Sequence, residues 1–186
     1  HHGVVNALVH HASLCVRRAI NSSYVRFHDF ERTLQLNYFG CLRLTMCLLP
    51  KMISRKRRNI INISSLGVLT NAARFSAYVA SKAALEAWTR CASSELSDVG
   101  IKFTTINMPL VRTPMIAPTK LYQNVPTLAP EEAADMIAEA IVYKPVPLET
   151  RVGGFVQLLP PLMPALATRV HQPAPRPLHP PVHTPP

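Results

Sequence analysis

The chain has 186 residues, of which 48% are hydrophobic, and its 20 Lys and Arg against 10 Asp and Glu give a formal net charge of +10. This length allows one domain with or without a tail, and the apolar content excludes a wholly disordered chain. There is no window of about 18 consecutive apolar residues, so no transmembrane helix is expected. The chain starts at His1 with neither Met nor a secretory signal pattern, so we expect a fragment.

Short apolar runs alternate with amphipathic segments along the first 143 residues. The runs predict strands over Val4–Val9, Ile60–Ile63 and Ile101–Ile106, and apolar residues at steps of three and four predict helices over Phe27–Met52, Ala77–Leu96 and Pro130–Tyr143. Strands that alternate with helical crossovers of this length predict an α/β fold. We therefore expect a doubly wound, Rossmann-like parallel sheet with helices on both faces.

Proline marks the boundary of this domain. Twelve of the 18 prolines lie from Pro145 onward, and proline supplies no amide donor for a helix or a central strand. We expect a folded unit over residues 1–150 and an extended, solvated tail over residues 151–186. The tail is interpreted as having no partner, and could arise from out-of-frame translation. The alternative, a ligand for a polyproline-binding domain, depends on the single P-x-x-P formed by Pro177 and Pro180.

Cysteine and charge patterns bear on cofactors, partners and compartment. The four cysteines form no C-x-x-C pair, which favours reduced thiols, no metal site and a cytoplasmic location; they are Cys15, Cys41, Cys47 and Cys91. The basic run from Lys51 to Arg58 follows a predicted helix and contains no aromatic residue. It is interpreted as a solvated helix end rather than a nucleic-acid contact.

Three polar residues carry the chemistry that the sequence suggests. Tyr78 and Lys82 lie four residues apart at the start of a predicted helix, so they share one face. A nearby cation lowers the pKa of a phenol, which would make Tyr78 a general acid or base. Ser65 follows a predicted strand, at the edge of a parallel sheet where ligands bind, and its hydroxyl could donate to a carbonyl oxygen.

In this order and spacing, Ser65 and the Tyr78-x-x-x-Lys82 pair resemble the signature of the short-chain dehydrogenases/reductases. Asn37 matches a helix asparagine of that family, and the resemblance runs from about Val4 to Tyr143. It implies that Tyr78 exchanges a proton with a carbonyl or alcohol and that Ser65 orients the carbonyl. It also implies that Lys82 lowers the Tyr78 pKa and holds the ribose of NADP or NAD, and that Asn37 holds a water relaying protons toward Lys82.

Other family positions match less well. The segment from Asn107 to Thr113 lies where the family has Asn-Pro-Gly and then Thr, which implies cofactor contacts by Pro109 and Thr113, although Met108-Pro109 replaces Pro-Gly. His10-His11-Ala12-Ser13 stands in place of Asn-Asn-Ala-Gly. We interpret the histidine pair as sequence drift rather than a metal site, because no third ligand stands at a suitable spacing.

The family's glycine-rich phosphate-binding turn, Gly-x-x-x-Gly-x-Gly, does not occur in this chain. We therefore expect that the first half of the dinucleotide-binding fold is missing, together with the residue that selects NAD or NADP. The chain alone is expected to be inactive. A non-catalytic scaffold or a degraded gene product is the alternative interpretation.

Substrate and assembly are indicated only coarsely. Apolar residues are frequent between Pro114 and Leu128, where the family has its substrate loop, and Thr104–Thr119 resembles the branch with bacterial fatty acyl-CoA and fatty aldehyde reductases. The resemblance thus implies reduction of an apolar carbonyl substrate with NAD(P)H. It also implies a homo-oligomer formed through the two long predicted helices.

Overall fold

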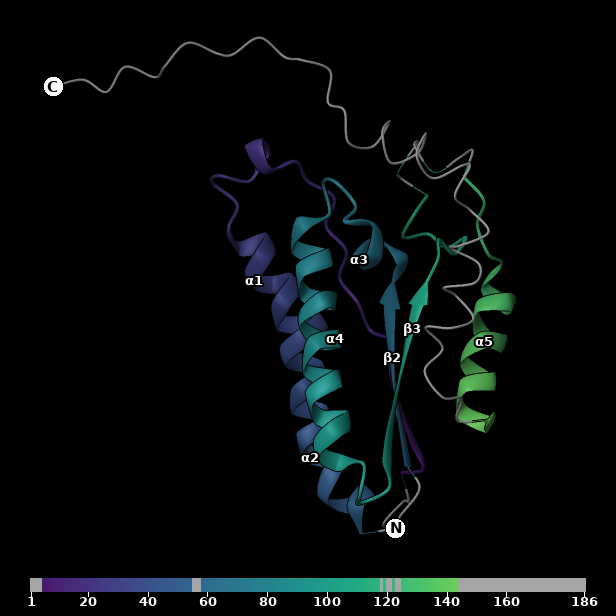
Figure 1. Ribbon diagram of the computed structural model, residues 1–186. Helices are drawn as coiled ribbons and strands as arrows, with labels where there is room; N and C mark the ends of the chain where they lie inside the picture. The colour runs from purple at the N-terminus through teal and green to yellow at the C-terminus, as the bar shows by residue number, and fades with distance from the viewer. Residues whose placement is uncertain (1–4, 55–57, 118, 120–121, 123–124, 144–186) are drawn as a thin grey trace, which may run out of the picture.

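The computed structural model describes residues 5–54, 58–117, 119, 122 and 125–143 (Figure 1). Its sheet has three parallel strands in the order β1-β2-β3, with β1 at Ala7–His10, β2 at Arg58–Ser65 and β3 at Ile101–Met108. The α/β fold with a parallel sheet is thereby confirmed. The predicted start of the first strand is wrong, because pairing begins at Ala7, opposite Asn59, and extends to His10.

The first long helix is continuous but changes type in its middle. It consists of α1 (His28–Leu34), the π-helical segment η2 (Gln35–Gly40) and α2 (Cys41–Ile53). The residues at both junctions keep right-handed helical backbone angles, so the helix is not broken. The predicted extent is confirmed within one residue at each end, and the π turn was not predicted from the sequence.

A short connection at the end of β2 leads into the second long helix. Ser65 ends β2 and caps α3 (Leu66–Thr70), its Oγ accepting a hydrogen bond from the Gly67 amide at 3.1 Å. A Cβ atom at Gly67 would lie 3.3 Å from that oxygen, so glycine allows the close approach. Helix α4 (Ser76–Leu96) then starts after a turn in which Asn71 and Arg74 have positive φ angles of 51° and 70°.

Helices cover both faces of the sheet, as expected. In Figure 1, α2 and α4 lie on one face, while α5 (Pro130–Tyr143) lies on the other. On the α5 face, Ile61 and Ile106 pack with Ala133 and Ala140. On the opposite face, near the amino ends of the strands, Ile60 and Ile101 pack against Met52. The turn before β3 contains Gly100 with a φ of 79°, a conformation that suits glycine.

The structure bears only in part on the expectations for the cysteines and for the proline-rich tail. The four cysteines, expected as reduced thiols, form no disulfide among the described residues; Cys41 is buried and Cys15 half-buried, whereas Cys47 and Cys91 are exposed. The expected tail over residues 151–186 lies outside the described residues. Within the described part of the chain, no helix combines the length and apolar character needed to cross a membrane.

Candidate active site

The structure brings together the three residues on which the sequence argument depends. Ser65 lies at the carboxyl end of β2, and Tyr78 lies in the first turn of α4 with its phenol next to the Ser65 hydroxyl. Lys82 follows one turn later, is 2% exposed, and donates a hydrogen bond from Nζ to the Ile63 carbonyl at 2.8 Å. An acid, a hydroxyl donor and a buried cation thus converge at one edge of the sheet.

The electrostatics of this group differ from the sequence expectation. Burial raises the pKa of Tyr78 above its usual value, and the nearby Ser65 hydroxyl opposes that rise. Burial also lowers the pKa of Lys82. Burial is the largest influence on the pKa of the Tyr78 phenol, and Lys82 is not among the groups that shift it. Tyr78 is therefore protonated at neutral pH, and its proton can pass to an oxygen that becomes more basic as negative charge develops on it.

Asn37 is fully buried and forms a clamp between three segments. Its Nδ2 donates to the Leu14 carbonyl at 2.9 Å and to Ser81 Oγ at 2.9 Å, and its Oδ1 accepts from the Leu14 amide at 2.8 Å. Ser81 in turn donates to the Tyr78 carbonyl at 2.7 Å. Both Asn37 donors are used by protein atoms, so only Oδ1 retains capacity for a further partner. The side chain ties the segment after β1 to the helix that carries Tyr78.

A second cluster, centred on Glu86, was not predicted from the sequence. The Glu86 Oε1 atom accepts hydrogen bonds from Ser64 Oγ and, at 2.8 Å, from Asn107 Nδ2. Asn107 Nδ2 also lies 3.4 Å from the Ser65 carbonyl. One carboxylate, one turn after Lys82, thereby connects the ends of β2 and β3 to α4. A glutamate in a helix usually faces solvent, so no local pattern indicated this role.

Further side chains near Tyr78 come from segments that the sequence argument did not use. The Ser13 Oγ atom is buried without a hydrogen-bond partner among the described residues, although it lies near enough to the phenol to favour its ionised form. Burial raises the pKa of the nearby Cys15 thiol to about 11, so it remains protonated at neutral pH. Tyr122, in the expected substrate loop, stacks on Phe75 with ring centres 6.4 Å apart.

The histidine pair after β1 is divided between two environments. His10 is buried, and its Nε2 lies 2.9 Å from Thr45 Oγ1, while His11 is exposed. Burial lowers the pKa of His10 to about 4, and the Lys82 charge acts in the same direction. The His10 ring is therefore neutral at pH 7 and occupies a hydrogen-bonding position in the core.

The segment after β3 contains the two expected cofactor contacts, Pro109 and Thr113. Both are half-buried, and the segment is held by main-chain hydrogen bonds from the Arg112 amide to the Leu128 carbonyl at 2.9 Å and from the Leu128 amide to the Leu110 carbonyl at 2.8 Å. No hydrogen bond of the Thr113 side chain occurs among the described residues, so its hydroxyl is free for a ligand. Pro109 has no amide proton to offer.

The nicotinamide end of a dinucleotide fits these residues, whereas its phosphates do not. The Lys82 ammonium has three donors, and within the described chain one of them is used, by the Ile63 carbonyl. Two buried N–H groups at the end of the sheet suit the hydroxyls of a ribose. The glycine-rich turn that would let main-chain amides approach a diphosphate is absent from the sequence.

Known proteins resemble this chain in sequence and in fold. Residues 1–123 match the model of the short chain dehydrogenase family. A fatty acyl-CoA reductase of Acinetobacter baylyi is 60% identical over 154 residues, which cover 83% of this chain and 52% of that protein. A fatty acyl-CoA reductase of Mycobacterium tuberculosis is 43% identical over 158 residues, covering 84% of this chain and 54% of that protein.

A solved structure supports the same fold. A short chain dehydrogenase from Burkholderia cenocepacia, crystallised with NADP, superposes with a TM-score of 0.69 at 23% identity, covering 90% of this chain and 69% of that one. At this identity the likeness concerns the fold alone. The chain spans about half the length of the two bacterial reductases that it matches.

Proposed function

The chain belongs to the short chain dehydrogenase family, and on that premise we propose that it is the catalytic part of an NAD(P)H-dependent reductase of fatty acyl-CoA or fatty aldehydes. The observation that carries the proposal is the convergence of Ser65, a protonated Tyr78 and the buried Lys82 ammonium at the carboxyl end of β2. The names of the two bacterial reductases support the substrate class. The NADP-bound Burkholderia structure supports the cofactor.

In this proposal each residue acts on a stated atom. Ser65 Oγ accepts from the Gly67 amide, which leaves its own proton free to donate to the substrate carbonyl oxygen. Tyr78 gives its phenolic proton to that oxygen as negative charge develops there. Lys82 holds the ribose hydroxyls with its two remaining N–H groups. The nicotinamide, when bound, supplies the hydride.

The neighbouring residues keep this group in position. Asn37 fixes the segment after β1 against α4, and Glu86 fixes the ends of β2 and β3 against the same helix. Thr113 offers a free hydroxyl to the carboxamide of the nicotinamide. The apolar residues between 114 and 128 favour an alkyl chain, and Tyr122 is placed next to Phe75 at the start of α4.

A hybrid protein tests the proposal. The N-terminal half of the Acinetobacter reductase, which contributes the residues before the matched region, is joined to this chain, and oxidation of NADPH or NADH is followed with dodecanal and with dodecanoyl-CoA. We expect reductase activity with at least one of these substrates. The Tyr78→Phe variant is expected to lose about 100-fold or more in kcat, because the proton donor is removed.

Tyr24→Phe is the matched control, since the Tyr24 side chain is 80% exposed. That variant should retain the activity of the hybrid. A hybrid that reduces neither substrate, or one whose activity survives Tyr78→Phe, would contradict the proposed function.

A further inference from the structure

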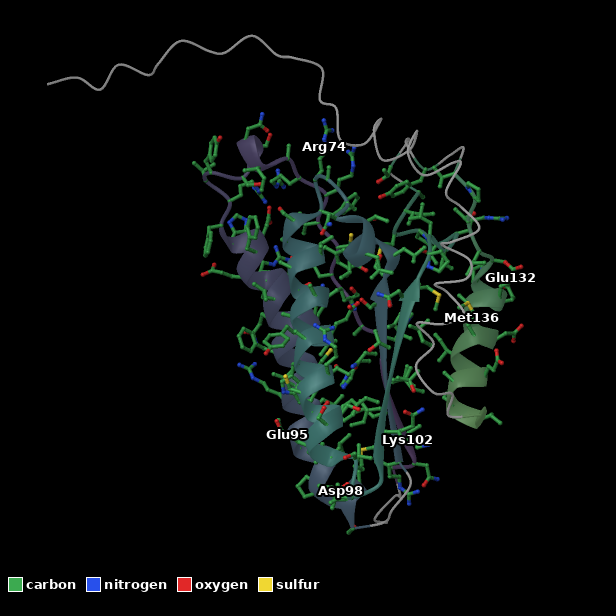
Figure 2. All side chains as sticks on the ribbon, viewed as in Figure 1. Arg74, Glu95, Asp98, Lys102, Glu132 and Met136 are labelled. Atoms are coloured by element: carbon green, nitrogen blue, oxygen red, sulfur yellow. The ribbon has the colours of Figure 1, made fainter. Side chains whose placement is uncertain are left out.

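The segments that surround Tyr78 carry positive charge without negative charge. Residues 11–27, residues 66–78 and residues 109–117 contain no Asp or Glu, although they contain Arg17, Arg18, Arg26, Arg74 and Arg112. In Figure 2, Arg74 lies at one end of the molecule, while Glu95 and Asp98 lie at the other end. The segments next to Tyr78, at the end where β2 and β3 terminate, are therefore positively charged.

One buried carboxylate, that of Asp29, pairs with two of these arginines. The Asp29 side chain accepts from Arg18 Nε at 2.8 Å and from Arg26 Nε at 3.1 Å, and the Arg26 hydrogen bond is the main reason that its pKa is lowered. Arg17 and Arg74 are exposed and form no ion pair with any described residue. Asp29 thus holds Arg18 and Arg26 in place, whereas the guanidinium groups of Arg17 and Arg74 are available to bind a ligand.

These two arginines flank the approach to Tyr78. The Arg18 amide donates to the Arg74 carbonyl at 2.7 Å, so the two arginine-bearing segments are in contact. Arg74 directly precedes Phe75, which stacks on Tyr122. Burial raises the pKa of Tyr122, and the Arg17 charge is close enough to oppose that rise. An aromatic pair next to the site is therefore bordered by two unpaired cations.

We propose that Arg17 and Arg74 bind the phosphate groups of coenzyme A while the acyl thioester reaches Tyr78. This inference rests on the proposed function. An acyl-CoA joins an apolar chain to a thioester and, beyond the flexible pantetheine arm, to a diphosphate and a 3′-phosphate. The planar guanidinium matches phosphate oxygens with two parallel hydrogen bonds. In the protein, Tyr122 of the apolar loop and the two arginine-bearing segments lie next to one another beside Tyr78.

Binding to the full 186-residue chain, without cofactor, tests the inference. Coenzyme A, 3′-dephospho-coenzyme A and pantetheine are titrated into the chain by calorimetry at low ionic strength. We expect coenzyme A to bind most tightly, the dephospho form more weakly and pantetheine most weakly. We also expect the affinity for coenzyme A to fall as salt is added, because the contacts are between exposed charges.

Two substitutions remove the guanidinium groups without disturbing the backbone. Arg17→Gln and Arg74→Asn are each expected to weaken coenzyme A binding about tenfold, as for a lost charge-assisted hydrogen bond. Asn is chosen at position 74 because it tolerates the positive φ of that residue. Arg17→Lys, which keeps the charge, should retain more affinity than Arg17→Gln. Circular dichroism verifies that each variant keeps the fold.

Arg90→Gln is the control for the loss of one positive charge. Arg90 is exposed on α4 and lies 12 residues after Tyr78, about 18 Å along the helix. It should leave coenzyme A binding unchanged.

Four results would overturn the inference. The first three are the absence of coenzyme A binding to the chain, an equal effect of Arg90→Gln and Arg17→Gln, and equal affinities for coenzyme A and pantetheine. Displacement of bound coenzyme A by NADPH would also overturn it, because the arginines would then belong to the cofactor site. No reduction takes place in this experiment, so its result is independent of whether the hybrid protein is active.

Discussion

Two adjacent serines at the end of β2 have different partners. Ser65 caps α3 and faces Tyr78, whereas Ser64 donates to Glu86. Family spacing pointed to Ser65, and in the structure Ser65 rather than Ser64 lies against the phenol. The Glu86 cluster could not be predicted, because its partners Ser64 and Asn107 lie 22 and 21 residues away in the chain and become neighbours only when β2, β3 and α4 are assembled.

The folding stability of the chain is expected to depend on pH through His10. Its pKa is about 4 in the folded chain and 6.5 in the unfolded chain, so the unfolded state binds the extra proton. The contribution of neutral His10 to the free energy of unfolding should be fully present above pH 6.5. It should decrease as the pH drops toward 4, by roughly 2 kcal/mol at pH 4.5. His10→Asn should remove this component of the acid destabilisation, measured by urea unfolding at pH 7 and at pH 4.5.

His11→Asn is the matched control, because His11 is exposed. Its acid destabilisation should equal that of the unsubstituted chain. If His10→Asn and the unsubstituted chain lose the same stability between the two pH values, the neutral, buried state assigned to His10 is wrong.

The π-helical segment η2 is an element that the sequence did not indicate. Periodicity predicts the helix over Phe27–Met52, because apolar residues recur along one face, but an extra residue within a turn leaves no signature in that pattern. The segment contains Asn37, whose amide clamps Leu14 and Ser81. Long helices and β-branched strands were predictable, whereas this local irregularity required the packing against α4.

Removal of the Asn37 amide tests the clamp. Asn37→Ala should cost about 3 kcal/mol of unfolding free energy, because it deletes three hydrogen bonds and leaves the Leu14 amide and carbonyl unpaired in the interior. Ser81→Ala, which removes only one acceptor of the Asn37 amide and one contact to the Tyr78 carbonyl, should cost about 1 kcal/mol. Both values come from urea unfolding at pH 7.

Gln35→Ala serves as the comparison, since Gln35 lies in the same π-helical segment with an exposed side chain. It should change stability by less than about 0.5 kcal/mol. If Asn37→Ala costs no more unfolding free energy than Gln35→Ala, water must replace the hydrogen bonds of the Asn37 amide in solution.

On the scale of the whole molecule, the sequence contains the proposed catalytic residues but no glycine-rich phosphate-binding turn. We expect the 186-residue chain to bind NADPH and NADH too weakly to saturate at micromolar concentrations, because no main-chain amides can approach the diphosphate. Calorimetric titration of both dinucleotides measures this. The hybrid with the Acinetobacter N-terminal half is the positive control and should bind at least one of them in that range.

Micromolar binding of either dinucleotide by the chain alone would contradict this expectation, because it would show that the glycine-rich turn is not needed for dinucleotide binding.

The association through the long helices that the family resemblance implies stays a prediction. Four side chains on the first long helix are between 43% and 53% exposed and available for it; they are Leu36, Phe39, Leu44 and Met46.

Near the carboxyl ends of the strands, the two faces of the sheet have unlike chemistry, and this decides how the sequence can vary there. Toward α5, residues such as Ile61, Ile106 and Ala140 fill space, and exchanges among apolar residues of similar volume are tolerated there. Toward α4, Asn62 donates to Thr89 at 2.7 Å, and Ser64 and Asn107 share Glu86. A single replacement on that side leaves a buried polar side chain without its hydrogen-bond partner. At this end of the sheet, single apolar exchanges are expected to be tolerated on the α5 face, whereas replacement of a hydrogen-bonded residue on the α4 face requires a compensating change in its partner.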